Sequence, residues 1–443
     1  MFDPVIFDRA LIGFSLAVHI ILAVMGIAIP VIVSAAEFIG IRTGNQIYET
    51  IAKRISVALV IFFAVGTASG MLVAVELFAL WPSFMVLVGQ VALLTVLIEV
   101  GFFFLEAVFL AIYIYGWDSF KNRYAHWAMS IPVIIGAGGS AMMITMLNAF
   151  MNTPVGFNIQ NYLATGTLSG INPLAVFNGP STWVEVSHVL STSYFTGAMI
   201  VAAYLAYRML RAKRDSKVYE YHAKALRIAL AISAIAIIFT IYTGINSITA
   251  MYAQQPEKYA AMEADLIPQS HAPEYIGGLY INGTLQYYIP IPDMQSVLAT
   301  GSPNGTVPGL SSYPQSTWPP LIIHPLFDLM VILGFALGGF FALVAILYLL
   351  RRTPLKVRPI LWLTLVAGSL SVLLLEAGWI VDELGRQPWI IYGVMTVNQA
   401  ANYSQSVVPI TIVLMAVYII VVPFTLYVLK KVFDGRPLEK ELR

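Results

Sequence analysis

The sequence contains no cysteine and little charge. Of its 443 residues, only 11% are Asp, Glu, Lys or Arg. The lack of cysteine excludes disulfides, thiolate zinc sites, iron–sulfur clusters and covalent haem attachment through C-x-x-C-H. Histidine, methionine, carboxylate and tyrosine remain as candidate metal ligands. The net charge of +1 lacks the basic excess of a general nucleic-acid-binding protein, so no nucleic-acid partner is expected.

Apolar residues dominate what is present. They make up 59% of the chain, and the mean hydropathy is +0.80. Soluble globular proteins carry about 25% charged residues, so this composition predicts an integral membrane protein. The first 24 residues have no basic n-region and no small-residue cleavage site. We interpret them as the start of a retained first span rather than a signal peptide.

Nine apolar stretches are long enough to cross a membrane, because about 20 residues span a hydrocarbon core of about 30 Å. The expected fold class is therefore an all-α integral membrane protein with nine transmembrane helices. The stretches lie at 11–35, 55–79, 91–115, 127–150, 183–207, 225–249, 321–350, 359–381 and 406–429.

The distribution of Lys and Arg predicts the orientation. All but three of the 24 fall in the connections and tail that nine spans place on one side of the membrane. The exceptions are Arg9, Lys258 and Arg386. Basic residues concentrate on the cytoplasmic side, so we expect the N-terminus outside and the C-terminus inside.

The chain divides into three expected parts. Residues 1–249 hold the first six spans, residues 250–320 form a large extracytoplasmic loop, and residues 321–443 hold the last three spans and a cytoplasmic tail. The loop begins with a short amphipathic helix in YAQQPEKYAAMEADL and continues into a Gly-, Pro- and Ser-rich stretch. Loops of this length are usually functional or disordered.

Carboxylates occur at the end of the eighth span, in EAGWIVDELGRQPW from Glu376 to Trp389. Glu376, Trp379 and Glu383 share one face of a helix because they are spaced i, i+3 and i+7. An ionisable residue inside a span is costly and indicates function. We interpret Glu376 in that way, and Asp382 as a charge at the headgroup level.

Several potential iron ligands fall at one depth. Counting 1.5 Å per residue from the outer helix ends places five of them in the outer half of the membrane: His19, Glu99, His188, Met330 and Glu383. Glu106 lies near the middle, on the same helical face as Glu99 because the two are seven residues apart. The pattern favours a haem layer with a proton relay leading to it. The alternative is a transporter with a buried carboxylate and histidine site.

The other four histidines are interpreted as interfacial residues rather than ligands. His126 and His222 lie near inner helix ends, His271 lies in the outer loop, and His324 begins the seventh span.

With these residues in place, the chain resembles subunit I of the cytochrome bd quinol oxidases over nearly its whole length. The most specific motif is GRQPW following EAGW-x3-E. Further matches are IEVGFFFLEAVFLAIYIYGW, SAMMITMLNAFMNTPVGF, SHVLSTSYFTGAM around His188 and HPLFDLMVILG around Met330. The compact outer loop is similar to that of the short quinol-loop members.

The resemblance implies roles for the haem ligands. His188 and Met330 match the axial ligands of a low-spin haem b. His19 and Glu383 match the ligands at two high-spin sites, with Glu99 beside one of them. These sites would hold a high-spin haem b and a haem d, or a further haem b in place of haem d.

The resemblance also implies the remaining site residues. Trp379 matches an aromatic residue between haems, and Arg386 matches an arginine near haem propionates or carboxylates. Glu106, Ser140 and Asn148 match polar positions of a proton pathway. With Glu99, the residues Glu106, Trp379 and Arg386 form the expected catalytic set. Lys258 and Glu263 match the quinol-binding pair of the family.

The implied activity is quinol:oxygen oxidoreduction in a prokaryotic plasma membrane. Ubiquinol or menaquinol would be oxidised near the outer face and O2 reduced to water, building a proton-motive force without pumping. The implied partners are a second membrane subunit, subunit II, and a small accessory subunit. Two alternatives stay open: a quinone-linked b-type cytochrome that does not reduce O2, and a secondary transporter without cofactor.

Overall fold

A computed structural model describes residues 3–350 and 352–442 and contains the nine expected spans within them. Eight consist of one long helix each, and the fourth is formed by the short α5 followed by α6. The bounds are α1 (Pro4–Thr43), α2 (Gln46–Leu80), α4 (Leu93–Tyr115), α5 (Arg123–Ala128), α6 (Ser130–Asn152), α8 (Thr182–Arg211), α9 (Lys217–Gln254), α12 (Ile323–Leu349), α13 (Arg358–Gly385) and α15 (Val407–Asp434). The predicted all-α membrane fold is confirmed.

The shorter elements lie in the connections. The helices are α3 (Pro82–Val91), α7 (Ile159–Thr165), α10 (Pro256–Met262), α11 (Met294–Thr300), α14 (Val397–Ala400) and α16 (Leu438–Glu441). The strands are β1 (Glu274–Ile276), β2 (Leu279–Ile281), β3 (Thr284–Gln286), β4 (Ile289–Ile291), β5 (Trp389–Ile391) and β6 (Met395–Thr396). They form three antiparallel pairs, β1–β4, β2–β3 and β5–β6.

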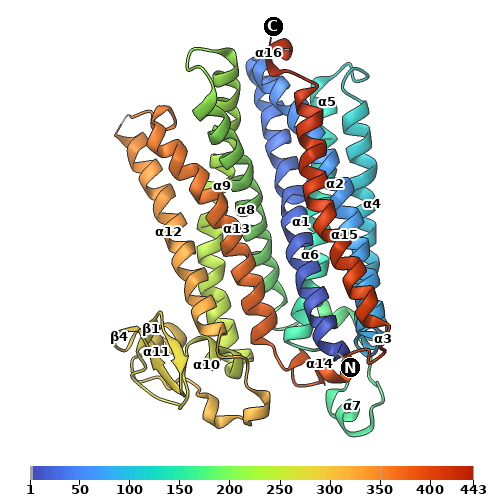
Figure 1. Ribbon diagram of the computed structural model, residues 1–443, viewed down its shortest axis with the longest axis vertical. Coiled ribbons are helices and arrows are strands. Elements are labelled where there is room, and N and C mark those ends of the chain that lie inside the picture. Colours follow the sequence, from blue (N-terminus) through green and yellow to red (C-terminus); the bar gives the residue numbers. More distant parts are fainter. Residues whose placement is uncertain (1–2, 351, 443) are drawn as a thin grey trace.

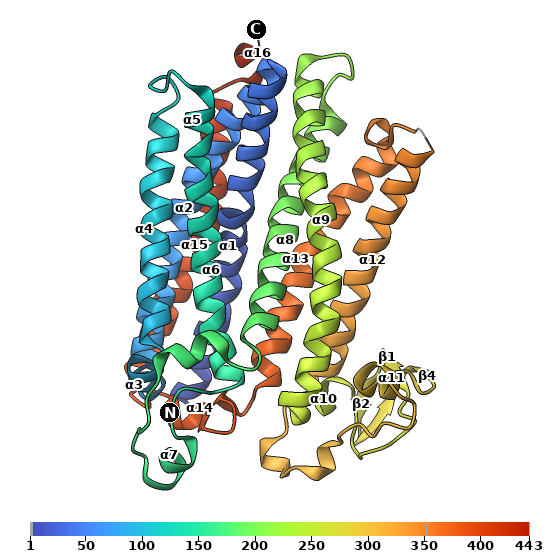
Figure 2. The same cartoon turned by 180° about the vertical axis from the view of Figure 1, so that it is seen from behind.

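The long helices run side by side in two groups (Figures 1 and 2). One group contains α8, α9, α12 and α13, and the other contains α1, α2, α4, α6 and α15. The N-terminus, α7 and the loop with β1–β4 lie at one end of the bundle, while the C-terminus lies at the opposite end. We call the end with the N-terminus the outer end, following the orientation predicted from the charges.

Helix ends follow the local sequence. The Asp3 side chain accepts a hydrogen bond from the Val5 amide, and Pro4 occupies the first turn of α1, where its missing N–H costs nothing. Gly44 ends that helix in the left-handed conformation, and Asn45 caps the start of α2. The tight reversal keeps α1 and α2 adjacent along their length.

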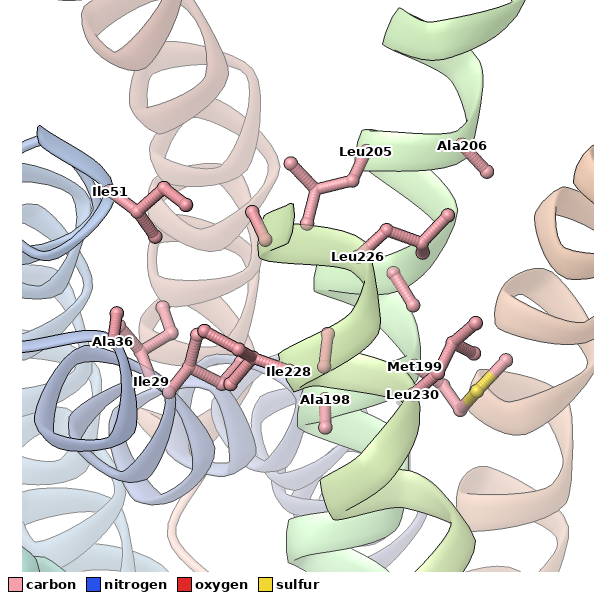
Figure 3. Packing of buried hydrophobic residues seen from close by; sticks show 14 of the residues in the cluster. Ile29, Ala36, Ile51, Ala198, Met199, Leu205, Ala206, Leu226, Ile228 and Leu230 are labelled. Carbon is pink, nitrogen blue, oxygen red and sulfur yellow. The ribbon is translucent and has the colours of Figure 1, made fainter. Parts of the chain in front are cut away.

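Small residues permit close packing between the long helices. Figure 3 shows Ala36, Ala198 and Ala206 in the central cluster of apolar side chains, beside larger residues such as Ile29 and Leu226. Within a bilayer the lipid tails are as apolar as leucine, so helices associate mainly through such close contacts.

The outer loop is folded rather than extended. The expected amphipathic helix is present as α10, separated from α9 by Gln255 and started by Pro256. The Tyr280 hydroxyl donates to the Ala264 carbonyl at 2.5 Å and ties the β2–β3 hairpin to the residues after α10. The Gly-, Pro- and Ser-rich stretch contains two short 3-10 helices, Leu310–Ser312 and Gln315–Thr317.

Gly197 of α8 tests this close packing. A Cβ atom there would lie 2.5 Å from the Ala28 Cβ of α1 and closer still to the Val24 carbonyl oxygen. We expect Gly197→Ala to destabilise the protein by about 1–3 kcal/mol, because overpacking forces the backbones apart. Thermal unfolding in detergent measures the effect. Gly334→Ala on α12, where a Cβ meets nothing within 4 Å, is the matched control and should not lower Tm.

Candidate functional site

His19 is held in one tautomer by Ser69. Its Nδ1 lies 2.9 Å from the Ser69 Oγ, and that hydroxyl donates its single hydrogen to the Gly66 carbonyl. We therefore assign the hydroxyl as the acceptor from His19, which places the imidazole proton on Nδ1. The Nε2 lone pair is left available for a metal.

His188 is arranged in the same way by a threonine. Its Nδ1 lies 3.0 Å from the Thr243 Oγ1, and that hydroxyl donates to the Phe239 carbonyl at 2.8 Å. The ring proton is again fixed on Nδ1, and Nε2 presents a lone pair. Two helix pairs, α1 with α2 and α8 with α9, thus hold a histidine by the same device.

Each histidine, and also Met330, faces a glycine on a neighbouring helix. A Cβ at Gly70 would lie 3.5 Å from the His19 Nε2, one at Gly244 would lie 3.4 Å from the His188 Cε1, and one at Gly378 would lie 3.3 Å from the Met330 sulfur. A side chain would crowd the His19 ring at Gly70, where the Cε1 atom would be 3.0 Å away, and the Met330 sulfur at Gly378, whereas a Cβ at Gly244 would reach His188 only in ordinary contact.

These surroundings fit haem better than a bare metal ion. The described residues contain no group of three or more His, Cys, Asp or Glu side chains able to chelate an ion. A haem brings its own macrocycle ligands and requires only one or two axial ligands from the protein. Single histidines with a fixed tautomer and a cleared face meet that requirement.

Glu99 and Glu106 follow one face of α4 toward α6. The Ser140 hydroxyl of α6 donates to the Glu99 carboxylate at 2.7 Å. Glu106 is buried where α6 comes closest, since a Cβ at Gly136 would lie 2.7 Å from its Cβ. The structure thus brings Glu99 and Ser140 together and places Glu106 two turns further toward the inner end. Their role in proton transfer stays a prediction.

Glu376, Trp379 and Glu383 all lie on the uninterrupted helix α13, as the spacing predicted. The Oε1 of Glu376 is buried and forms no hydrogen bond within the described chain. The Glu383 carboxylate accepts from the Arg386 Nη2 at 2.8 Å. Trp379 is half-buried between them.

Asp382 is the centre of a polar network near the outer end of α13, and its side chain is 23% exposed. Its carboxylate accepts from the Lys258 Nζ at 2.9 Å, the Asn148 amide at 2.7 Å and the Asn152 amide at 3.1 Å. Arg386 lies 3.6 Å away and is 1% exposed. One carboxylate therefore joins α6, α10 and α13.

Asn148, Asn152 and Arg386 extend the network. Both amide oxygens accept from the Arg386 guanidinium, at 3.2 and 2.9 Å. The Asn152 amide also donates to Glu185 of α8 at 3.1 Å. Asn148 thus lies in this network, while Ser140 contacts Glu99 elsewhere on α6.

Asn152 and Glu185 were not predicted as site residues from the sequence, and Asp382 was predicted only as a charge at the headgroup level. The i,i+4 spacing of Asn148 and Asn152 on α6 was the available signal, since two amides on one helical face require partners inside a membrane. The acidic partners of these two asparagines lie more than 30 residues away in the sequence, on other helices. The spacing of residues within one helix therefore could not predict the pairing.

Lys258 and Glu263, the predicted quinol-binding pair, have different surroundings. Lys258 is 1% exposed and forms its ion pair with Asp382. Glu263 is buried among other carboxyl groups of the loop. Burial raises its pKa, and the charges of Glu274 and Asp265 raise it further. The pair therefore spans the loop and the end of α13 without forming a direct contact.

Burial also raises the pKa values of two other carboxyl groups in the loop, those of Asp265 and Glu274. Burial raises the pKa of Asp265 to about 7, although the side chains of Gln295 and Gln269 donate hydrogen bonds that lower it. Burial also raises the pKa of Glu274. The loop thus contains carboxyl groups whose pKa values are raised, so that they stay protonated at higher pH than an ordinary carboxyl group.

Two of the histidines interpreted as non-ligands use both ring nitrogens within the protein. His126 bonds to Glu37 at 2.6 Å and to the Tyr113 carbonyl at 2.9 Å. His324 bonds to the carbonyls of Met262 and Gly277. Both histidines are buried, and neither has a free lone pair for a metal in this arrangement.

The Lys258–Asp382 ion pair can be tested by stability. Lys258 is 1% exposed and Asp382 is 23% exposed. Removing one member of a largely buried pair costs up to about 3 kcal/mol, because the remaining carboxylate loses its closest cationic partner. We expect Lys258→Met to lower Tm in detergent. The double variant Lys258→Met with Asp382→Asn should recover at least half of the loss. Equal Tm values for the wild type and Lys258→Met would contradict this role.

Asp265 gives the outer loop a pH-dependent stability. Its folded-state pKa lies above the unfolded value of about 3.9, so the folded loop holds a proton that the unfolded loop has lost. The stability of the loop should therefore fall as pH rises from about 4 to about 7. Hydrogen–deuterium exchange of residues 256–310, corrected for intrinsic rates, measures this change.

The matched variants are Asp265→Asn and Asp293→Asn, the latter changing an exposed carboxyl of the same loop. We expect Asp265→Asn to weaken the pH dependence and Asp293→Asn to preserve it. An unchanged dependence in Asp265→Asn would assign the effect to other groups.

Comparison with known proteins gives a consistent family. A family model described as Cytochrome bd terminal oxidase subunit I matches residues 7–437. A Bacillus subtilis (strain 168) protein provisionally named cytochrome bd menaquinol oxidase subunit I is 34% identical, over 99% of both chains. The cytochrome bd ubiquinol oxidase subunit 1 of the same organism is 26% identical, over 87% of this chain and 83% of its own. The solved structure of bd oxidase from Geobacillus thermodenitrificans matches with a TM-score of 0.90 and 37% identity, over 98% of this chain and 99% of that chain.

Proposed function

The chain belongs to the cytochrome bd terminal oxidase subunit I family, and from that premise we propose that it oxidises a membrane quinol and passes the electrons to O2. It is a multi-pass protein of the bacterial membrane whose family uses haem cofactors, quinol and a membrane partner subunit. The observation that carries the proposal is the pair of histidines, His19 and His188, each with its proton fixed on Nδ1 and its Nε2 available.

We assign the low-spin haem b to His188 and Met330. Gly378 supports this assignment because a side chain there would crowd the Met330 sulfur. His–Met ligation suits electron transfer, since it leaves no iron position open to oxygen.

The two high-spin sites are assigned to His19 and to Glu383, with Glu99 beside one of them. These sites take a high-spin haem b and either haem d or a further haem b. Bound haems would supply the electron-transfer and oxygen chemistry. The protein residues would hold them and position charge: Arg386 keeps the Glu383 carboxylate oriented through its 2.8 Å hydrogen bond.

Quinol is proposed to bind at the outer loop, near Lys258 and Glu263, with ubiquinol or menaquinol as the substrate. Oxidation of a quinol releases protons as well as electrons. Asp265, whose pKa burial raises to about 7, can accept such protons near neutral pH and release them to the outer water. Subunit II and a small accessory subunit are the proposed partners.

Protons for water are proposed to arrive from the inner side through Glu106 and Ser140 and then Glu99. Releasing protons outside and consuming protons from inside builds a proton-motive force without a pump. Glu99 and Ser140 lie in direct contact, which supports the last step. A cytochrome that does not reduce O2 would need only the His188 and Met330 site, so His19 and the α4 carboxylates favour the oxidase.

His188→Ala tests the ligand assignment. We expect the reduced-minus-oxidised visible spectrum of the purified complex to lose the low-spin b-type signal, since no other side chain replaces Nε2. The polypeptide should still insert into the membrane. His271→Ala, at an exposed position of the outer loop, is the matched control and should leave the spectrum unchanged.

Oxygen uptake with quinol separates the oxidase from the plain cytochrome. Uptake by the wild type and its loss in His188→Ala are expected. A spectrum with b-type bands and no oxygen uptake would favour the cytochrome, and a folded protein without any haem would overturn the ligand set.

A further inference from the structure

A second set of buried polar residues lies where α1, α2 and α15 meet, away from the predicted proton pathway on α4 and α6. Each helix contributes one side chain four residues from its outer end and another seven residues deeper. The outer three are Asp8, Glu76 and Thr411, and the deeper three are Ser15, Ser69 and Tyr418. All six are at most 2% exposed, and we call them the outer polar seam.

Several atoms of the outer polar seam have no hydrogen-bond partner within the described chain. They are both carboxylate oxygens of Asp8, both of Glu76, and the hydroxyls of Ser15 and Thr411. No Lys or Arg among the described residues forms an ion pair with either carboxyl group. The Ser15 hydroxyl lies beside the Glu76 carboxyl, and the Asn402 backbone lies beside Asp8, which satisfies part of the polar demand of these atoms. A buried polar group without a partner costs about 1–3 kcal/mol, so the rest of that demand favours a companion molecule.

The seam is extended rather than arranged around a point. From Asp8 to His19 the helix rises by about 16 Å, at 1.5 Å per residue. Ser15 lies beside both the Glu76 carboxyl and the Tyr418 hydroxyl, midway along this length. One cation cannot reach groups spread over such a distance, whereas a chain of water molecules can bond to each in turn.

The outer polar seam has one end near the outer surface and the other beside His19. Asp8 lies beside the backbone of Asn402, which directly precedes the exposed stretch 403–406 at the outer end. At the deep end, the Tyr418 hydroxyl donates to the Ser69 carbonyl at 3.1 Å, and the Ser69 hydroxyl accepts from His19. The seam therefore connects the outer surface to the residue that fixes His19.

We propose that the outer polar seam is a hydrated passage that carries water between the His19 site and the outer aqueous phase, with Asp8 and Glu76 as the carboxyl groups that line it. Its use in turnover rests on the proposed function. An oxidase forms water inside the membrane, and this passage lets that water leave without crossing the Glu99 and Glu106 pathway.

Infrared spectroscopy of the purified complex tests hydration directly. A protonated carboxyl group in apolar surroundings has a C=O band that shifts when its proton exchanges for deuterium. We expect part of this band to shift within minutes of transfer to D2O, and the shifting part to diminish in Glu76→Gln and in Asp8→Asn. Glu220→Gln, at an exposed ion pair on α9, should leave it unchanged.

Blocking the passage gives a second measurement. Ser15→Val removes the hydroxyl and fills the space beside Glu76, so exchange of the Glu76 band should slow at least tenfold. Ser15→Thr keeps a hydroxyl and should slow it less. Unfolding temperatures show whether each variant is folded.

The outcomes are distinct. A carboxyl band that does not exchange, or one that Glu76→Gln leaves unaltered, would overturn the passage. Neither measurement requires turnover or bound haem. A protein without haem would therefore contradict the proposed function while leaving the test of the passage intact.

Discussion

The ion pair between the buried Lys258 and the partly exposed Asp382 connects the two functional regions of the molecule. Lys258 comes from the outer loop, and Asp382 lies one residue before the candidate haem ligand Glu383. The same carboxylate takes hydrogen bonds from Asn148 and Asn152 of α6. Charges buried at this depth are stable only with matched partners, so loop, α6 and α13 must assemble together.

This network also explains how Arg386 can remain charged with 1% exposure. Its guanidinium is surrounded by oxygen atoms from two asparagines and Glu383, and Asp382 lies within 4 Å. A guanidinium is suited to such a task because its donors lie in a fixed plane. The GRQPW segment therefore acts as the anchor that holds the end of α13 in register with α6.

Much of the fold could be predicted from the sequence because hydrophobic length and basic charge are local properties. The nine spans were found in this way, and so was the shared face of Glu376, Trp379 and Glu383. The motif around GRQPW further identified the family. Pairing across the bundle could not be predicted: the sequence places Asp382 at a helix end, and only the folded chain brings Lys258 and α6 against its carboxylate.

The tethered serine and threonine beside the two histidines have a consequence for assembly. Because Ser69 and Thr243 each donate to a carbonyl of their own helix, the imidazole protons are directed by the polypeptide alone. The rings need no tautomer change when iron arrives. Biogenesis can therefore proceed in two stages. The membrane helices insert and pack first, and the prosthetic groups then bind to sites whose histidine ligands are already oriented.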